Sequence, residues 1–318
     1  MLKAAFDVGS GSTKMVVLDD VGGTVMSRVA DVLLAHDMEA AGGEISDGIA
    51  EQLAGTLKEF AENARQCAEA RGEQILLGGV ATAVFRKARN AKAVLERASK
   101  ASGVDIDIID QKTEGRLGYE TCKALHPSAR LAWDSGGASF QLSHISEDNL
   151  MVYEGPWGAS TATAALVRDV RGMTFERSSA VNPVSLDECV RLKRHLMDSM
   201  PDSPGWLADA RAPLVGCFGG ETSAFNVARL VLEADGDAPG TGSIAHDALW
   251  RALERQCVGH GDDELARRGF HLQVEMTVPK VVLVCAVLER VLGPDTDVRY
   301  SAANGSCEGV ASYWLRNK

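Results

Sequence analysis

The sequence has no hydrophobic run that approaches the roughly 20 residues needed to cross a bilayer. It also lacks the layout of a secretory signal peptide, because the first residues lead directly into an apolar segment of strand type. Its 45% hydrophobic and 24% charged residues, with a mean hydropathy of -0.06, are typical of a globular protein. We therefore expect a cytoplasmic protein with no membrane partner.

Basic residues are in deficit: 33 Lys and Arg stand against 44 Asp and Glu, for a formal net charge of -11. A global field of this sign opposes non-specific binding to nucleic acid, so no nucleic-acid partner is expected. A polyanionic substrate would have to meet a local basic patch.

Cysteine is present but scattered. None of the seven cysteines forms a C-x-x-C pair, and no His stands at ligand spacing from them. This arrangement indicates neither a zinc site nor a disulfide framework, and we expect reduced thiols that are mostly buried.

What is present is a conspicuous hairpin at residues 4–17. An apolar run ends in Asp7, a turn of small residues follows, and a second apolar run begins beside Lys14. Glycines allow close approach of the backbone to an anion, hydroxyls donate hydrogen bonds, and Asp7 is placed to hold a metal-bound water. The same pattern also fits an ordinary Gly/Ser turn. The candidate phosphate-binding residues here are Gly9, Ser10, Gly11, Ser12 and Lys14.

A second hairpin of the same pattern is predicted at residues 131–142, where an apolar strand, an acid, a glycine turn, a hydroxyl and an apolar strand follow in the same order. Two such hairpins predict two similar α/β domains whose loops face each other across a cleft. We expect a first domain over residues 1–130, completed by a final helix at 303–318, and a second over 131–302. The candidate residues of the second hairpin are Asp134, Gly136, Gly137, Ala138, Ser139 and Gln141.

Local signals predict several further elements. The pattern predicts a helix from Ser46 or Asp47 that ends at Gly72, and a capping box at Ser185 and Glu188 that opens a helix through residue 200. Other predictions are a loop at 82–90 with three cations in four positions, a helix capped by Asn90, a strand at 213–218, a surface loop at 235–242, and helices at 243–257 and 303–315.

Two features have competing interpretations. Glu114 lies in the first turn of a predicted helix, where a carboxylate complements the helix dipole without any catalytic role. Gly219 and Gly220 join a strand to a helix N-terminus, which suits an anion or a ribose but equally a plain connecting loop.

Taken together and in order, these motifs resemble the exopolyphosphatase and guanosine pentaphosphate phosphohydrolase family, within the superfamily of actin, sugar kinases and heat-shock ATPases. The family's Asp-x-Gly-Ser-x-Ser loop is similar to residues 7–12, and its Glu-x-Arg-Leu-x-Tyr element to residues 114–119. The family's Ala-Thr element with its later Arg, Ala and Asn matches Ala81, Thr82, Arg86, Ala88 and Asn90, and the later loops match residues 134–141 and 219–220.

The resemblance implies an α/β fold of two actin-like, ribonuclease H-like domains with a cleft between them. It implies a hydrolase that releases terminal phosphate from inorganic polyphosphate or from guanosine penta- or tetraphosphate with Mg²⁺ or another divalent cation. By position, Glu114 corresponds to the residue that activates water, Arg86 to a phosphate-binding cation, and Asp7 and Asp134 to acids near the metal. Homodimerisation is left open.

The sequence also departs from the family pattern. Where the second loop of the family ends Ser-Thr-Glu, this chain has Ser139, Phe140 and Gln141, so an amide replaces a carboxylate. Lys14 stands near a position where arginine is common. These changes motivate a second hypothesis, a phosphate- or nucleotide-binding protein with weak or no turnover. An ATPase or kinase activity on the same fold is a third.

Overall fold

The computed structural model describes residues 1–147, 149–211, 214–236 and 242–316. Within them the chain divides into two compact units, one formed by Met1–Thr121 with Asn304–Lys318 and the other by Cys122–Ala303. The division falls inside helix α5, Gln111–Leu125. Residues 122–130, assigned to the first domain by the sequence interpretation, therefore belong to the second unit.

The first unit is built on a five-stranded sheet of order β3-β2-β1-β4-β5. The strands β1 to β3 form an antiparallel meander, while β4 and β5 run parallel to β1. The strands are β1 Leu2–Val8, β2 Ser12–Leu18, β3 Thr24–Asp31, β4 Ile75–Ala81 and β5 Asp105–Ile108. The helices are α1 Leu34–Ala40, α2 Asp47–Arg71, α3 Ala83–Lys87, α4 Ala91–Ser102, the first part of α5, α13 Cys307–Ser312 and the 3₁₀ turn η4 Trp314–Arg316.

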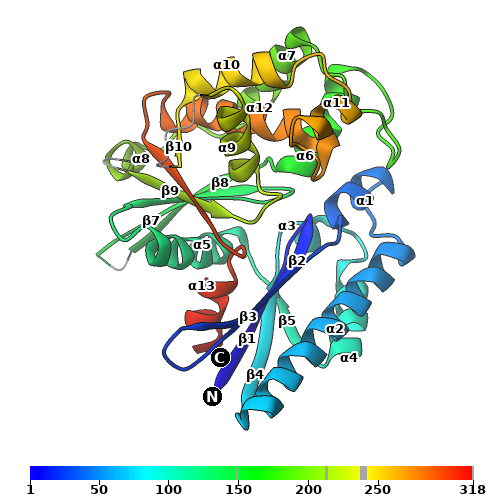
Figure 1. Cartoon of the computed structure of the whole chain (residues 1–318), viewed down its shortest axis with the longest axis vertical. Coiled ribbons are helices and arrows are strands. Elements are labelled where there is room, and N and C mark those ends of the chain that lie inside the picture. Colours follow the sequence, from blue (N-terminus) through cyan, green and yellow to red (C-terminus); the bar gives the residue numbers. More distant parts are fainter. Residues whose placement is uncertain (148, 212–213, 237–241, 317–318) are drawn as a thin grey trace. The chain divides into compact units, whose positions relative to one another are not determined.

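Helices cover both faces of this sheet. Figure 1 shows α2 and α4 along one face and the C-terminal α13 beside the other. The cluster under α13 joins strand residues such as Ala5 and Val16 to Leu117 of α5 and Val310 of α13. Because both faces are covered, the parallel strand β4 in the interior of the sheet reads as a continuous apolar run in the sequence.

The second unit is built on a six-stranded sheet of order β10-β11-β9-β6-β7-β8. Its strands are β6 Leu131–Ser135, β7 Phe140–Ser146, β8 Asn149–Gly155, β9 Val215–Gly219, β10 Ser243–Ile244 and β11 Val298–Ala302. Its helices are α6 Ala159–Ala165, α7 Leu186–Asp198, α8 Gly205–Ala210, α9 Ala224–Ala234, α10 His246–Gln256, α11 Asp262–Arg267 and α12 Thr277–Val287, with π-helical η1 Leu166–Val170 and η3 Leu288–Leu292 and the 3₁₀ turn η2 Val274–Met276. Every residue of α12 is buried, so this helix is the centre of the core.

The two sheets repeat one topology. Taken from β8, the order β8-β7-β6-β9-β11 matches β3-β2-β1-β4-β5 strand for strand, with the same antiparallel and parallel neighbours. Strand β10 is an addition at the edge of the second sheet. The prediction of an α/β protein with two similar domains is confirmed.

The predicted helix end and capping box, whose interacting residues are close in sequence, are confirmed. Helix α2 ends at Gly72 in the left-handed conformation, and Ser185 and Glu188 form both bonds of the capping box. Residues 82–90 are not all loop, because they include α3. Asn90 precedes α4, but its side chain does not cap that helix. Instead its Oδ1 accepts from the Ile45 N–H and its Nδ2 donates to the Ile45 carbonyl.

Two predicted helices were too long. Residues 243–257 begin with the short strand β10, which pairs with β11, and α10 starts only at His246. Residues 303–304 have no regular structure and 305–306 form a turn, so α13 starts only at Cys307. Pro213 of the predicted strand and residues 237–241 of the predicted surface loop lie outside the described residues. Across the part of the chain that the structure describes, no helix combines the length and apolarity that a membrane span requires.

Candidate active site

The side chains of Arg86 and Glu114 meet in the first unit. Arg86 Nη2 lies 2.7 Å from Glu114 Oε2, and its Nη1 donates to the carbonyl of Ile109 at 3.0 Å. Glu114 is 7% exposed. Short helix α3, the end of β5 and the start of α5 therefore hold one ion pair between a buried carboxylate and a half-buried guanidinium. The two residues predicted to be catalytic are brought together.

The position of Glu114 follows from how α5 begins. Asp110 Oδ1 accepts from the backbone N–H of Thr113 at 2.7 Å, and the Asp110 carbonyl accepts from the Glu114 N–H at 3.0 Å. Hydrogen bonds from the side chain and the backbone of Thr113 hold the pKa of Asp110 below its usual value. Since Asp110 already caps the helix, the Glu114 side chain is not required for that role and turns to Arg86 instead.

Of the cations at 86–89, Arg89 has a structural task. Its guanidinium donates to the carbonyl of Gly42 at 2.7 Å and lies 3.3 Å from Glu44. Arg89 thereby ties the end of α3 to the connection between α1 and α2.

The first glycine loop, residues 9–11, joins β1 to β2. It is closed by a hydrogen bond from the Gly9 N–H to the Ser12 carbonyl at 3.0 Å, and the Ser10 carbonyl accepts from Ala35 at the start of α1 at 2.8 Å. Asp7 and Lys14 are directly opposed on the two strands, and Lys14 Nζ lies 3.9 Å from Asp7 Oδ2. The hairpin thus presents a buried acid beside a partly exposed cation.

Sequence reasoning missed that residues 304–308 reach this hairpin. The Ser306 N–H donates to Asp7 Oδ2 at 3.2 Å, and a Cβ on Gly305, which has φ 64°, would lie 2.7 Å from the same oxygen. Asn304 Nδ2 fixes the segment by donating to the carbonyls of Met15 and Arg28 and to Ser27 Oγ. No local pattern signals this contact, because its partners stand 299 residues apart.

Glu308 adds a second carboxylate to this group. Its Oε2 is buried and has no hydrogen-bond partner among the described residues. Burial raises the pKa of Glu308, the nearby Asp7 raises it further, and Lys14 opposes both effects. The group around the first glycine loop is therefore two acids and one cation.

The second glycine loop, residues 136–139, joins β6 to β7 in the second unit. The Gly136 N–H donates to the Ser139 carbonyl at 2.9 Å, the same closure as in the first glycine loop. The carbonyls of Gly136 and Gly137 accept from the first backbone N–H groups of α6. A Cβ on Gly158 would lie 2.3 Å from the Ala138 nitrogen, so Gly158 is a further requirement of this loop that sequence reasoning missed.

Gln141 lies opposite Asp134 across β6 and β7. It is 1% exposed, and its Nε2 donates to Ser139 Oγ at 3.2 Å. The amide that replaces the family's carboxylate is therefore turned toward the hydroxyl of the second glycine loop.

The Gly219–Gly220 turn follows β9. Tyr300 Oη donates to the Gly219 carbonyl at 2.9 Å, and the Ser223 N–H donates to the Gly220 carbonyl at 3.0 Å. Ser223 Oγ then caps α9 by accepting from Asn226. The turn is firmly braced, and exposed Glu221 stands on it.

The polar residues predicted for the site therefore form three groups, two in the first unit and one in the second. Arg86 with Glu114 and Asp7 with Lys14 belong to the first unit, and Asp134 with Gln141 and Ser139 to the second. Among the described residues, no three His, Cys, Asp or Glu side chains form a metal-binding group. The donors present still suit Mg²⁺, because a carboxylate and an amide oxygen on neighbouring strands are hard ligands, and Mg²⁺ takes few protein ligands and keeps its waters.

Two mixed sheets of the same topology, each opening with a hairpin that carries a glycine loop, define the two-domain actin-like α/β class. The sequence profile of the Ppx/GppA phosphatase family matches residues 15–185. The chain belongs to the Ppx/GppA phosphatase family.

Known proteins agree with this assignment. Exopolyphosphatase 1 of Mycobacterium leprae and exopolyphosphatase 1 of Mycobacterium tuberculosis are each 29% identical over 178 residues, which are 53% of this chain and 50% of theirs. The chain spans about half the length of the curated relatives it matches.

Solved structures share the fold along the whole chain. An exopolyphosphatase from Cytophaga hutchinsonii has a TM-score of 0.74 at 18% identity and covers 100% of this chain and 98% of its own. A Ppx/GppA family member from Aquifex aeolicus has a TM-score of 0.68 at 18% identity, with 100% and 99% covered. At this identity the likeness establishes the fold alone.

Proposed function

We propose that the protein is a phosphoanhydride hydrolase that releases terminal phosphate from inorganic polyphosphate, with Glu114 as the base that activates water. Membership of the Ppx/GppA phosphatase family supports the reaction class, and the exopolyphosphatase relatives favour polyphosphate as substrate. Guanosine penta- or tetraphosphate is the alternative substrate of the same reaction.

The observation that carries the proposal is the contact of Arg86 with the buried Glu114 carboxylate. An adjacent guanidinium favours the ionised carboxylate, which is the form a general base needs. Glu114 takes a proton from water, the water oxygen bonds to the terminal phosphorus, and the bridging oxygen leaves with the shortened chain. In this proposal Arg86 binds a phosphate oxygen, while its contacts with the Ile109 carbonyl and with Glu114 keep the base oriented.

The glycine loops supply backbone N–H groups and hydroxyls to the phosphate oxygens, and Lys14 adds a point charge. A divalent cation near Asp7 or Asp134 would neutralise part of the charge of the polyphosphate. Positioning and charge neutralisation are the main requirements of phosphoryl transfer.

A second candidate is a binding protein of the same fold that turns its ligand over slowly. It is favoured by Gln141, whose neutral amide is occupied with Ser139 where the family has a carboxylate. Binding without turnover would leave the Arg86–Glu114 pair as a ligand contact only.

Substitution of the base tests the proposal. We expect Glu114→Gln to abolish phosphate release from polyphosphate while calorimetric binding of polyphosphate stays nearly intact, since a base is lost but little volume. Release should be assayed from polyphosphate, guanosine pentaphosphate and ATP over a range of Mg²⁺ concentrations. Full turnover in the variant would exclude Glu114 as the base, and release from ATP alone would reject the substrate assignment.

The partner of the base should behave differently. Arg86→Ala should weaken polyphosphate binding by about 1.5–3 kcal/mol, the range for a hydrogen bond to a charged group. Glu120→Gln is the matched control for Glu114→Gln, because Glu120 lies on the same helix and also pairs with an arginine, Arg116, at 2.8 Å. It should retain full turnover.

A further inference from the structure

Three polar side chains stand in one row across the second sheet. Asp134 of β6 lies opposite Gln141 of β7, and Gln141 lies opposite Glu154 of β8. Residues paired in this way project from the same face of a sheet. The row therefore places two carboxylates on either side of the Gln141 amide.

The adjacent residues establish which face this is. Trp133, Leu142 and Tyr153, each one position away from a member of the row, belong to the large hydrophobic core. Because side chains alternate along a strand, the row projects from the face opposite that core. That face therefore carries polar side chains at the strand positions nearest the second glycine loop.

The members of the row differ in burial and in bonding. Gln141 is 1% exposed, and its Nε2 binds Ser139, while its Oε1 accepts no hydrogen bond from any described residue. Glu154 is exposed, and its side chain has no hydrogen bond or ion pair within the described part of the chain. An amide oxygen with no donor, at a residue this buried, is suited to a cation.

We propose that Glu154 supplies the carboxylate that Gln141 lacks, so that Asp134, the Gln141 Oε1 and Glu154 together bind a divalent cation. Two strand spacings separate Asp134 from Glu154, about 9.6 Å between their backbones. Two carboxylates that lean over the central amide, with waters retained by the ion, can span that distance. The proposal rests on the proposed function only for the use of the cation, because binding itself needs no substrate.

Titration with Mn²⁺ alone tests the site, read by electron paramagnetic resonance and by calorimetry. Glu154→Gln should weaken Mn²⁺ binding about tenfold or more. Adding Gln141→Glu to that variant should restore binding, because the carboxylate returns to the neighbouring strand of the same row. Glu254→Gln, at an exposed position on α10 of the same unit, should leave Mn²⁺ binding unchanged.

Unchanged Mn²⁺ affinity in a Glu154→Gln variant with wild-type thermal stability would overturn the proposal. Loss of binding in Glu221→Gln with none in Glu154→Gln would also overturn it and would assign the carboxylate to the Gly219–Gly220 turn. Because no phosphate release is measured, the site can hold Mn²⁺ even if the proposed hydrolysis fails. Conversely, a loss of the proposed Mn²⁺ site would not contradict the proposed hydrolysis, because the phosphate-release assay tests hydrolysis separately.

Discussion

At the scale of single residues, the two glycines of the first loop have different reasons to be glycine. A Cβ on Gly9 would lie 3.0 Å from the Ser12 carbonyl, so the closure of the loop itself disfavours a side chain there. A Cβ on Gly11 would meet nothing within 4 Å, and Gly11 is not among the glycines with positive φ. The fold does not require glycine at position 11, and the approach of a ligand to the backbone is the reason we propose for it.

Gly11→Ala should therefore keep the fold and weaken polyphosphate binding, because a methyl group would stand where the phosphate approaches the backbone. Calorimetric binding and thermal unfolding of the variant measure the two effects. Gly55→Ala, inside α2 with nothing within 4 Å, is the control. It should stabilise the protein by about 1 kcal/mol without changing binding. Polyphosphate affinity equal to wild type in Gly11→Ala would show that the loop does not contact the ligand there.

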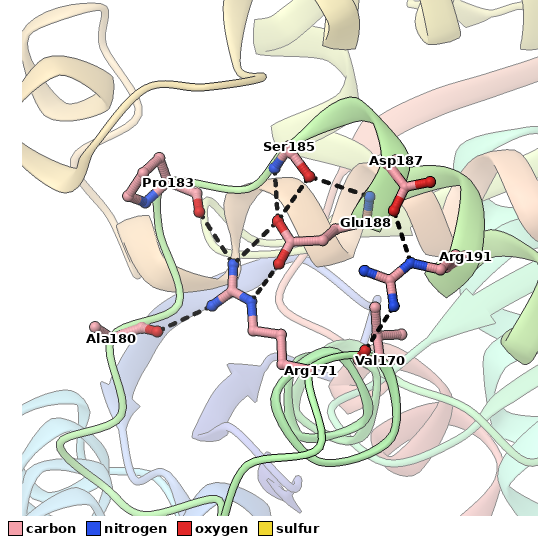
Figure 2. A network of polar contacts seen from close by, with 8 residues as sticks. All are labelled: Val170, Arg171, Ala180, Pro183, Ser185, Asp187, Glu188 and Arg191. Carbon is pink, nitrogen blue, oxygen red and sulfur yellow. Dashed lines mark hydrogen bonds and ion pairs between the residues drawn. The ribbon is translucent and has the colours of Figure 1, made fainter.

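At the scale of elements, the start of α7 is held by a polar network (Figure 2). The Arg171 guanidinium contacts Glu188 at 2.7 Å and donates to the carbonyls of Ala180 and Pro183 at 3.1 and 3.0 Å. Glu188 also accepts from the Ser185 N–H at 2.7 Å, which completes the capping box. One arginine thus joins the end of η1, the segment before α7 and the cap of α7.

Arg171→Ala should destabilise the second unit by about 2 kcal/mol, because it leaves two carbonyls without their side-chain donor and the Glu188 carboxylate without its cation. Arg191→Ala is the control in the same region. Its contacts with Asp187 at 2.8 Å and the Val170 carbonyl at 2.7 Å are exposed, so about 0.5 kcal/mol is expected. Urea unfolding followed by tryptophan fluorescence suits the measurement, because four of the five tryptophans, Trp133, Trp157, Trp206 and Trp250, lie in the second unit.

The same network predicts a pH dependence. Burial opposes ionisation of Glu188, yet hydrogen bonds from Arg171 and Ser185 outweigh it and lower the pKa of Glu188 from 4.5 to about 2. A depressed carboxyl pKa contributes stability that is full above the unfolded value and is lost as pH falls toward the folded value. The difference in unfolding free energy between wild type and Glu188→Gln should be constant near pH 7 and shrink below about pH 4.5. A difference that is the same at pH 7 and pH 3 would contradict this account.

At the scale of the whole molecule, the candidate site residues are divided between two units of the same topology. The Arg86–Glu114 pair and the first glycine loop belong to one, and the second glycine loop with Asp134 and Gln141 to the other. We predict that one phosphate chain engages both loops and that its binding is accompanied by closure of the two units on the ligand. Closure across a cleft stays a prediction.

Small-angle scattering measures that closure. Saturating polyphosphate should lower the radius of gyration of the wild-type protein, since ligand contacts in both units favour the compact state. Arg86→Ala, at the same polyphosphate concentration, should show a smaller change because fewer molecules are bound. An unchanged radius at saturation would count against domain closure.

The sequence by itself determined the features whose partners lie within a few residues. The two hairpins with an acid and a glycine loop, the Gly72 end of α2 and the Ser185–Glu188 capping box depend on turn and cap chemistry, which is local. Ordered motifs also identified the family. They selected Arg86 and Glu114 as candidates, and the structure adds the 2.7 Å contact between these two side chains.

Only the tertiary structure decided which distant segments meet. The contact of Ser306 with Asp7 and the row of Asp134, Gln141 and Glu154 depend on the path of the chain and the register of strands, and no local pattern encodes either. Tertiary contacts also overrode local propensity, since Asn90 bonds Ile45 rather than its own helix, and β11 draws residues 243–244 into a strand. Helix and turn signals act over about four residues, whereas packing and strand pairing join segments of any separation.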